Sequence, residues 1–338
     1  MKKVVALLTL VLFTASMLSA CGGTGGGGTS GGDTYVIANI PKCVGIAWWD
    51  RMEEGNKIFS KNTGHTVYQA SGDASADASE QLKYLEDSIA AGDDIITVIP
   101  NDPDACETTL AKAREQGIVV ISHEAEGMKN VDYDIEAFVN EEYGAHLMDL
   151  LAEQMGEEGG YCLMVGAFTM TSHQQWVEGA YKRQQEAYPN MYKVCENVES
   201  AAGGGGSDGS YKVAKEVIAT YPEVKGFIGC DMVDPPGIAM AVEEAGKAGQ
   251  IAVTGTCLVS CCEEYLDNGT IKVFSAWDPS TAGQAMCALG VIVKEGGEVY
   301  DGMDLGVPGF EHCTLKGNIL YGQAWFDGTA ENKGDYNF

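Results

Sequence analysis

Short apolar runs rich in β-branched residues alternate with amphipathic stretches along most of the chain. Such runs predict buried strands, because β-branched and aromatic side chains suit a pleated, packed surface. Two series of runs can be distinguished, one in each half of the chain. The predicted strands are Tyr35–Ile40, His65–Ala70, Ile95–Pro100, Ile118–Ser122 and Asp132–Val139, followed by Tyr161–Ala167, Tyr192–Val198, Gly226–Cys230, Ile251–Cys257 and Thr270–Trp277.

The stretches between the strands have the period of helices. Leu82, Leu85 and Ile89, for example, share one helical face. Asp102 followed by proline predicts a helix start, because aspartate caps the first turn and proline suits its first position. A long helix is expected over Pro279–Gly296. Alternation of strand and helix, sustained twice, predicts an α/β fold of two lobes with mostly parallel sheets.

Polar side chains gather where the predicted strands end. In open parallel sheets, ligands bind beyond the carboxyl ends of the strands. The strand ends are rich in neutral and acidic hydrogen-bonding groups with tryptophans nearby, which suits a neutral polyhydroxylated ligand better than a phosphate. The expected ligand-binding residues are Lys42, Trp48, Trp49, Asn101, His123, Glu124, His173, Gln174, Gln175, Asp231, Thr256 and Asp278.

Other kinds of site have weaker support in the sequence. His123, Glu124 and Glu126 have no HExxH or comparable spacing, so neither a metal site nor a catalytic acid–base pair is expected there. The glycines at 203–206 lack the lysine of a phosphate-binding loop and predict a flexible loop instead. We therefore expect no catalytic residue, no metal and no cofactor.

Composition and charge limit the kinds of partner that the protein can bind. The chain has 338 residues, 45% of them hydrophobic and 21% charged, which is enough for two globular domains. Its formal net charge is -28 at pH 7. A surface this acidic repels nucleic acids and anionic lipid head groups, so membrane attachment would have to be hydrophobic or covalent.

The N-terminus predicts export. Lys2 and Lys3 precede an apolar run, and together they indicate a signal peptide over residues 1–20. The small residues before Cys21 resemble a bacterial lipobox, which implies cleavage there and a diacylglyceryl group on the cysteine. An ordinary secretory cleavage site is the alternative. Residues 21–33 are glycine-rich and predict a lipidated, flexible tether. The protein is therefore expected outside the cytoplasm, anchored to the cell membrane.

The ten cysteines beyond Cys21 leave three possibilities open. Most can be free thiols, because a cysteine within an apolar strand behaves as a small hydrophobe. One or two disulfides are possible in an exported chain with an even cysteine count. A zinc site through Cys261, Cys262 and Glu263 is the third possibility.

Several segments resemble one protein family. They are IPKCVGIAWWDRMEEG after the first strand, VIPNDPDA after the third, HQQWVEGA in the second half and NKGDYNF at the end. Together they resemble the type I periplasmic solute-binding proteins of ABC sugar importers. The most similar branch contains rhamnose-binding and autoinducer-2-binding proteins, and the resemblance runs from about Tyr35 to the C-terminus.

The resemblance implies two Rossmann-like lobes joined by a three-segment hinge. The crossings are expected near Val139, Trp277 and Val307. The implied N-terminal lobe comprises residues 34–139 and 278–307, and the C-terminal lobe comprises residues 140–277 and 308–338.

Carried over residue by residue, the match to the autoinducer-2 binders is partial. Lys42 matches their ligand-contacting lysine, and Asp231 matches a retained aspartate. Their aspartate after the fourth strand falls at His123 or Glu124. Their Asp-Gln pair falls on Ser172 and His173, and the proline and alanine that flank the aspartate fall on Cys230 and Met232.

The resulting hypothesis is a lipid-anchored binding protein, without enzymatic activity. It would capture a sugar or sugar-like molecule between its lobes and deliver it to the membrane permease of an ABC transporter, acting as a monomer. Two alternatives are a receptor that presents autoinducer-2 or a sugar to a sensor kinase or chemoreceptor, and a surface hydrolase. The hydrolase would need a nucleophile and base that the sequence does not display.

Overall fold

The computed structural model describes residues 33–73, 78–336 and 338. Within it, residues Thr34–Phe338 form one compact unit. The predicted signal peptide, the lipidated Cys21 and nearly all of the tether lie outside the described residues. None of the helices in the described part is both long and apolar enough to cross a membrane.

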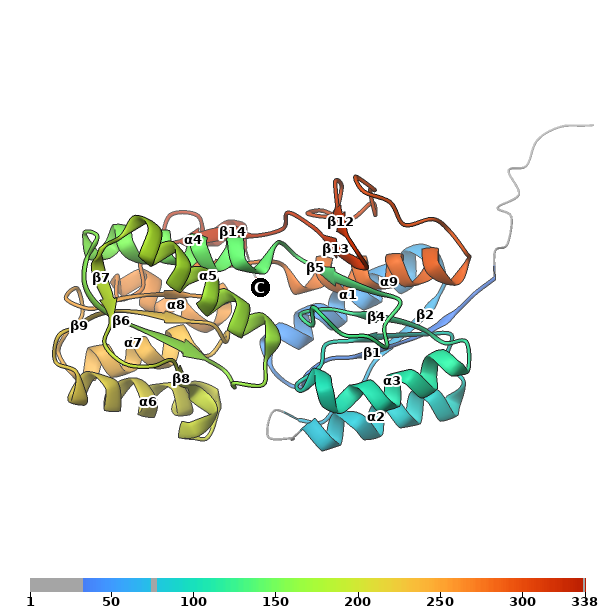
Figure 1. The fold of residues 1–338 in the computed structure, drawn as a ribbon, viewed down its shortest axis with the longest axis horizontal. Coiled ribbons are helices and arrows are strands. Elements are labelled where there is room, and N and C mark those ends of the chain that lie inside the picture. Colours follow the sequence, from blue (N-terminus) through green and yellow to red (C-terminus); the bar gives the residue numbers. More distant parts are fainter. Residues whose placement is uncertain (1–32, 74–77, 337) are drawn as a thin grey trace, which may run out of the picture. The chain divides into compact units, whose positions relative to one another are not determined.

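The first lobe is built around a seven-stranded sheet. Its strands follow the order β12-β13-β5-β4-β3-β1-β2, and β1 to β5 are parallel. Helices α2 and α3 cover one face, and α1 and α9 cover the other (Figure 1). The bounds are β1 Val36–Ile40, α1 Ala47–Thr63, β2 Thr66–Gln69, α2 Ala78–Ala91, β3 Ile95–Val98, α3 Pro103–Glu115, β4 Val119–Ser122, β5 Tyr133–Glu136 and α9 Pro279–Lys294.

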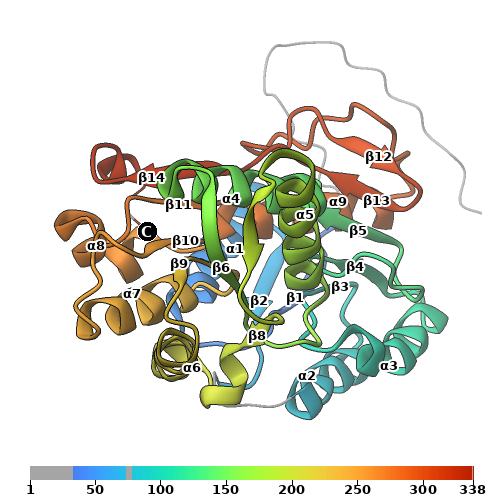
Figure 2. The same cartoon turned by 60° about the vertical axis from the view of Figure 1, so that its left-hand side comes forward.

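The second lobe has a parallel sheet in the order β10-β9-β6-β7, with β8 also paired to β6. Helices α4 and α5 pack together on one face, and α6 and α7 pack on the other (Figure 2). The bounds are α4 Asn140–Met155, β6 Glu158–Val165, α5 Thr171–Ala187, β7 Asn190–Lys193, β8 Val198–Glu199, η1 Ser200–Gly203, α6 Gly206–Thr220, β9 Val224–Gly229, α7 Asp234–Glu244, β10 Ala252–Gly255, α8 Val259–Asn268 and η2 Lys333–Asp335.

These two sheets confirm the predicted α/β class with parallel strands. The local signals act as expected at the helix start after β3. The Asp102 side chain accepts a hydrogen bond from the Ala105 backbone N–H at 3.2 Å, and Pro103 occupies the first turn. A single side-chain cap thus fixes where α3 begins, directly beyond a strand end.

The C-terminal part of the chain differs from the sequence-based division at one place. The sequence-based division assigns residues 308–338 to the second lobe, and strands β12 (Thr314–Lys316) and β13 (Ile319–Tyr321) fall within this range. Instead β13 pairs in parallel with β5, which places both strands on the first sheet. The free edge of β5 and burial of Leu320 account for this placement. The expected crossing near Val307 is therefore wrong.

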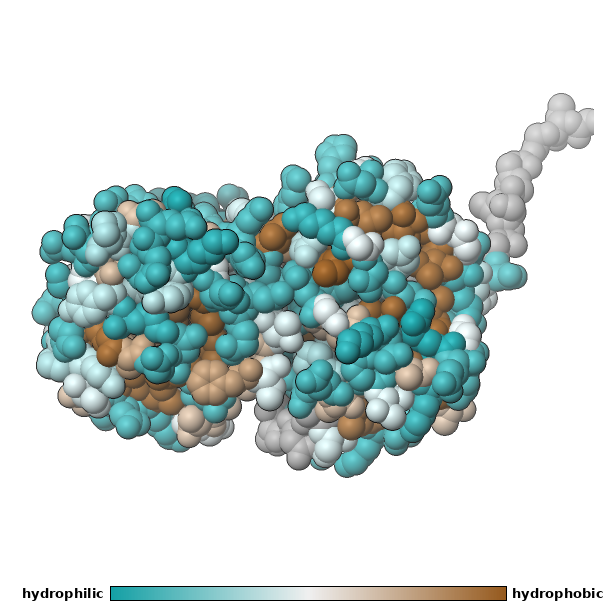
Figure 3. All heavy atoms as spheres, viewed as in Figure 1, coloured by the Kyte–Doolittle hydropathy of each residue, from teal (hydrophilic) through white to brown (hydrophobic). Residues whose placement is uncertain are grey.

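Beyond Tyr321 the chain returns to the second lobe. There β14 (Phe326–Thr329) pairs in antiparallel fashion with β11 (Val273–Ala276). The other lobe limits, 34–139, 278–307 and 140–277, remain predictions. The face seen in Figure 3 is mainly hydrophilic, with smaller apolar patches, as the large negative charge leads one to expect.

Two glycines bring α4 and α5 into backbone contact. A Cβ atom at Gly144 would lie 2.0 Å from the carbonyl oxygen of Trp176, and one at Gly179 would lie 2.2 Å from that of Glu141. Only residues without a side chain permit this approach. This contact sets the position of α5 against α4. The first turns of α5 carry His173 and Trp176 toward the other lobe.

Candidate functional site

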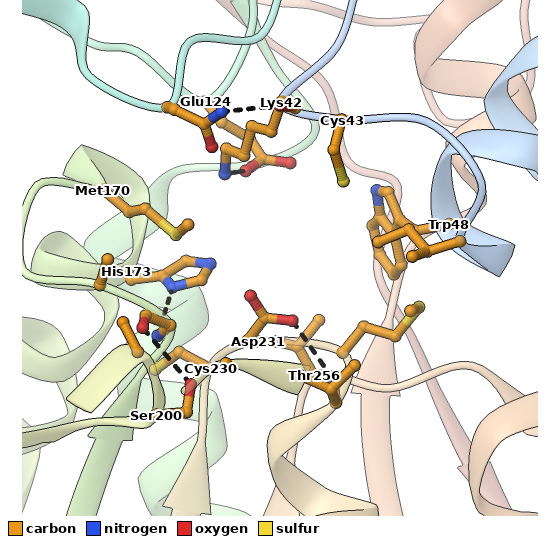
Figure 4. A pocket seen from close by; sticks show the side chains of 18 of the residues that line it. Lys42, Cys43, Trp48, Glu124, Met170, His173, Ser200, Cys230, Asp231 and Thr256 are labelled. Carbon is orange, nitrogen blue, oxygen red and sulfur yellow. Dashed lines mark hydrogen bonds and ion pairs between the residues drawn. The ribbon is translucent and has the colours of Figure 1, made fainter. Parts of the chain in front are cut away.

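A cavity of about 520 Å³ lies where strand ends of both sheets meet (Figure 4). Its polar groups come from both lobes, and four tryptophans contribute to its wall. The lining residues are Lys42, Cys43, Ile46, Trp48, Trp49, Asn101, Asp102, Glu124, Gly166, Ala167, Thr169, Met170, His173, Trp176, Ser200, Ala201, Gly205, Gly206, Cys230, Asp231, Met232, Val233, Thr256 and Trp277.

An ion pair forms the polar part of the cavity wall that the first lobe contributes. Lys42 Nζ lies 2.5 Å from Glu124 Oε2, and the two side chains are only 9% and 5% exposed. Lys42 follows β1 and Glu124 follows β4, so the pair joins two strand ends. The Asn101 amide donates to the Lys42 carbonyl oxygen at 2.6 Å, and the Ser172 hydroxyl of α5 donates to Glu124 Oε2 at 3.3 Å.

The charge state of Glu124 follows from this pairing. Burial alone would raise the pKa of its carboxyl group. The attraction of Lys42, together with the hydrogen bond from its ammonium group, outweighs burial and lowers that pKa to about 2. Glu124 is therefore an anion at neutral pH, with its charge compensated by Lys42. The cavity thus presents directional hydrogen-bonding groups rather than an excess of one charge at this wall.

His173 provides a neutral imidazole on the wall of the second lobe. Burial, followed by repulsion from Lys42, lowers its pKa to about 3. Its Nδ1 accepts a hydrogen bond from the Gly166 backbone N–H at 3.1 Å, so the ring proton of the neutral form resides on Nε2. His173 therefore offers one N–H donor to the cavity (Figure 4).

Asp231 is the second acidic group of the wall, and its carboxylate points into the cavity (Figure 4). One oxygen, Oδ1, accepts from the Val233 backbone N–H at 3.3 Å. A Cβ atom at Gly166 would lie 2.6 Å from the other oxygen, Oδ2, so glycine is needed there to leave this oxygen accessible. Burial raises the pKa of Asp231.

Aromatic side chains line the cavity beside the segment that follows β11. The rings of Trp48 and Trp277 meet edge to face, with centroids 4.6 Å apart. Trp176 lies 5.7 Å from Trp277 and donates from its indole nitrogen to Asn140 Oδ1 at 2.6 Å. The indole Nε1 of Trp277 is buried without a protein partner. A buried unpaired donor at a cavity wall is available to a ligand acceptor.

Asp278 lies outside the cavity lining, contrary to expectation. Its carboxylate forms two bonds to Arg51, from Nε at 2.9 Å and Nη2 at 2.7 Å, and also accepts from the Ser280 backbone N–H at 2.8 Å. A carboxylate bound by both prongs of a guanidinium and used as a helix cap is structural.

Three further expected residues also lie outside the lining. His123 is buried with its Nδ1 2.5 Å from the Ile135 carbonyl oxygen, so its ring is held against β5. Gln175 donates to Glu126 Oε2 at 3.0 Å. Gln174 follows His173 on α5 but lies on a different side of the helix, because successive helical residues point about 100° apart. The other eight expected residues do line the cavity, and their contact with a ligand remains a prediction.

Sequence reasoning missed the thioether, thiol and backbone parts of the wall. Met170, Met232, Cys43 and Cys230 all line the cavity. The glycines at 205 and 206 line it as well, although the sequence predicted only a loop there. The position of these residues at strand ends was the available signal. None of the described residues forms a group of three or more His, Cys, Asp or Glu side chains placed to hold a metal ion.

A buried pair of carboxyl groups behind the cavity predicts a pH-dependent stability. Asp134 and Glu136 lie two residues apart on β5, so both side chains are on one face of the strand, and both are buried. Burial raises the pKa of Asp134 to about 6 and that of Glu136 well above its ordinary value, and the charges of Glu126 and Glu124 add to both shifts. The folded state then binds more protons than the unfolded chain.

The contribution of this pair to the free energy of unfolding should therefore fall as pH rises from about 4 through 6 and above, by on the order of 1–3 kcal/mol. Urea unfolding measured across this range tests the sign. Glu136→Gln should flatten the decline, because the amide keeps an acceptor for the Ala125 N–H without titrating. The exposed Glu142→Gln should leave it unchanged. His173, whose pKa is lowered by burial, contributes in the opposite sense, so the effect of the pair is the difference between the wild type and Glu136→Gln. A wild-type stability that rises relative to that of Glu136→Gln over this range would contradict this account.

Comparison with known proteins agrees with the fold. A model of the periplasmic binding protein domain matches residues 37–298. The D-ribose/D-allose-binding protein of Pseudomonas aeruginosa is 24% identical over 276 residues, which cover 76% of this chain and 81% of that protein.

Two solved structures have closely similar folds. LsrB from Clostridium saccharobutylicum, in complex with AI-2, matches with a TM-score of 0.81 at 19% identity, covering 90% of this chain and all of that one. An ABC transporter solute-binding protein from Clostridium phytofermentas with bound L-rhamnose gives 0.80 at 21% identity, covering 90% and 98%. The family comprises binding proteins, in agreement with the expected absence of enzymatic activity. This chain belongs to the periplasmic binding protein family.

Proposed function

We propose that this protein captures a sugar or sugar-like small molecule in the cavity and delivers it to the membrane permease of an ABC transporter. The observation that carries the proposal is the composition of the wall. Trp48 and Trp277 offer apolar faces to sugar C–H groups, whereas Asp231, His173 and Asn101 offer hydrogen-bonding groups suited to hydroxyls. Because Lys42 compensates Glu124, no strongly charged ligand is required.

The relatives support the same ligand class. The relatives named above bind D-ribose or D-allose, AI-2 and L-rhamnose, which are all small and rich in oxygen. Lys42 and Asp231 match the autoinducer-2 pattern, but other positions of that pattern differ in this chain. We therefore favour a sugar over AI-2 itself.

Ligand binding would stabilise the closed arrangement of the lobes. The lobes also contact each other directly through three hydrogen bonds from the start of α5 and the loop before it. Gln175 donates to Glu126 Oε2 at 3.0 Å, Ser172 to Glu124 Oε2 at 3.3 Å and Thr169 Oγ1 to the Asn101 carbonyl oxygen at 3.3 Å. A ligand that bonds to residues of both lobes adds affinity only when the lobes are together, and it therefore shifts the population toward closure. The lipid anchor at Cys21 would keep the loaded protein near the permease.

The experiment is a ligand screen with residues 33–338. Melting temperature is measured against D-ribose, D-allose, L-rhamnose, D-arabinose and AI-2, with amino acids and nucleotides as non-sugar controls. A true ligand at 100 times its Kd adds about 2.7 kcal/mol of stability and raises the melting temperature by several degrees. Calorimetry then gives its Kd.

Two aspartate variants test whether the ligand binds in the cavity rather than on the surface. Asp231→Asn should weaken ligand binding at least tenfold, because it replaces an accessible acceptor oxygen with a donor. Asp50→Asn, on an exposed position of α1, should leave the Kd unchanged. A shift produced only by a non-sugar compound, or equal affinities in both variants, would refute the proposal.

A further inference from the structure

Two thiols of the second lobe lie side by side outside the cavity. Cys162 is buried in β6, and Cys195 is partly exposed in the segment between β7 and β8. Their sulfur atoms are 3.8 Å apart and share a hydrogen bond. Formation of a disulfide requires the sulfurs to approach to about 2.05 Å. The question is whether the backbone around Cys195 permits that movement.

The strand pairing leaves this segment outside the regular ladder. Tyr161 of β6 pairs with Lys193, and Met164 pairs with Val198. Residues 162–163 of β6 thus face the longer stretch 194–197, which bulges out of register. Extra residues in one strand are unpaired and bend away from the partner. The backbone at Cys195 is therefore free of the ladder hydrogen bonds that would hold its sulfur at a fixed distance.

The local environments of the two thiols make Cys195 the more acidic and Cys162 the less acidic of the pair. The hydrogen bond with Cys162 lowers the pKa of Cys195, the positive charge of Lys193 lowers it further, and the Cys162 pKa is raised. Burial has the opposite effect at the other partly exposed thiols, raising the pKa of Cys43 to about 11 and that of Cys261 as well. Because the thiolate is the attacking species, Cys195 is the accessible nucleophile and Cys162 the second thiol.

We propose that Cys162 and Cys195 form a reversible disulfide by exchange with a low-molecular-weight disulfide. The Cys195 thiolate attacks one sulfur of the small disulfide, which forms a mixed disulfide and releases one small thiolate. The Cys162 sulfur then attacks Cys195 Sγ and releases the second small thiolate, which takes up the proton of the Cys162 thiol. The protein pair is oxidised by two electrons, and the small disulfide is reduced to two thiols.

The bond would link two segments that lead into the ligand cavity. β6 continues from Cys162 to Val165 and is followed directly by Gly166, and the segment after Cys195 continues through β8 to Ser200. Both Gly166 and Ser200 line the cavity, and the Ser200 hydroxyl donates to the Gly166 carbonyl oxygen at 3.4 Å. A cross-link that restricts the unfolded chain should also raise the melting temperature by several degrees.

The test uses the full chain, purified in its reduced form and incubated without air with oxidised glutathione. Digestion without reduction, followed by mass spectrometry, should give a peptide pair joined through Cys162 and Cys195, with a mass loss equal to two hydrogen atoms. Dithiothreitol should reverse the change. Appearance of this pair before any adduct on Cys43 or Cys261 is the expected order.

Two variants distinguish formation of the mixed disulfide on Cys195 from closure of the protein disulfide by Cys162. In Cys162→Ala the reaction should stop at a stable glutathione adduct on Cys195, because the second thiol is absent, and alanine suits this buried position. In Cys261→Ser the cross-link should form as in the wild type. A persistent glutathione adduct on wild-type Cys195 would overturn the proposal, as would modification of Cys43 or Cys261 ahead of Cys195.

Discussion

Replacing Lys42 with methionine is expected to lower the free energy of unfolding by about 3–5 kcal/mol, because it leaves the buried Glu124 carboxylate without its cation. The loss is large since the pair is almost fully shielded from water, at 9% and 5% exposure. Ligand affinity should fall as well, because Glu124 would take up a proton or draw in water. Urea unfolding at pH 7 measures the first effect, and calorimetry with the screened ligand measures the second.

The double variant Lys42→Met with Glu124→Gln separates charge from packing. With no charge left to compensate, it should recover most of the stability lost in the single variant. Lys333→Met provides a surface control. Its two partners, Glu263 and Asp267, are exposed to solvent, so Lys333→Met should change stability far less than Lys42→Met does. Equal losses in Lys42→Met and the double variant would show that the charge of Glu124 is not the cause.

Replacing Trp277 with alanine is expected to cost about 3–5 kcal/mol of stability and most of the ligand affinity. The indole is 1% exposed and lies at the centre of an aromatic cluster. It meets Trp48 at 4.6 Å, Phe138 at 5.1 Å and Trp176 at 5.7 Å, so residues of both lobes lose a packing partner at once. Thermal and urea unfolding measure the loss in the free energy of unfolding.

Trp277→Phe tests the indole N–H on its own. Phenylalanine keeps much of the apolar volume but removes a buried donor that has no protein partner. Stability should therefore fall much less than in the alanine variant, because no satisfied hydrogen bond is lost. Ligand affinity should still drop about tenfold if the N–H donates to the ligand. Unchanged affinity in Trp277→Phe would mean that the ring acts through packing alone.

The sequence predicted those features of the fold that depend on local pattern. Buried runs such as Ile95–Val98 and Val119–Ser122 are strands as expected, because continuous apolar runs bounded by helix signals suit a covered parallel sheet. The start of α3 followed from Asp102 and its proline. The pairing of β13 with β5 could not be read in this way, since no local signal tells which sheet edge a late strand will join.

The expected site residues that do not line the cavity were misjudged for the same reason, because local sequence does not show which distant partner a side chain will meet. Asp278 does follow a strand end, but its carboxylate is taken by Arg51 of α1, a residue far away in the sequence. His123 and Glu124 are neighbours at another strand end, yet only Glu124 lines the cavity while the His123 ring bonds to the Ile135 carbonyl. Strand ends can be located from periodicity, but the direction of each side chain depends on partners that only the tertiary fold supplies.

The late arrival of β12 and β13 on the first sheet has a consequence for biosynthesis. β13 joins β5, although the whole polypeptide of the second lobe's central sheet lies between them in the sequence. The ribosome must therefore produce Tyr321 before the first sheet can be completed, and until then β5 remains an open edge. Contacts so distant in sequence form slowly, because a long loop must close first. The first sheet of the nascent chain therefore stays incomplete through most of translation, even though five of its strands are made early.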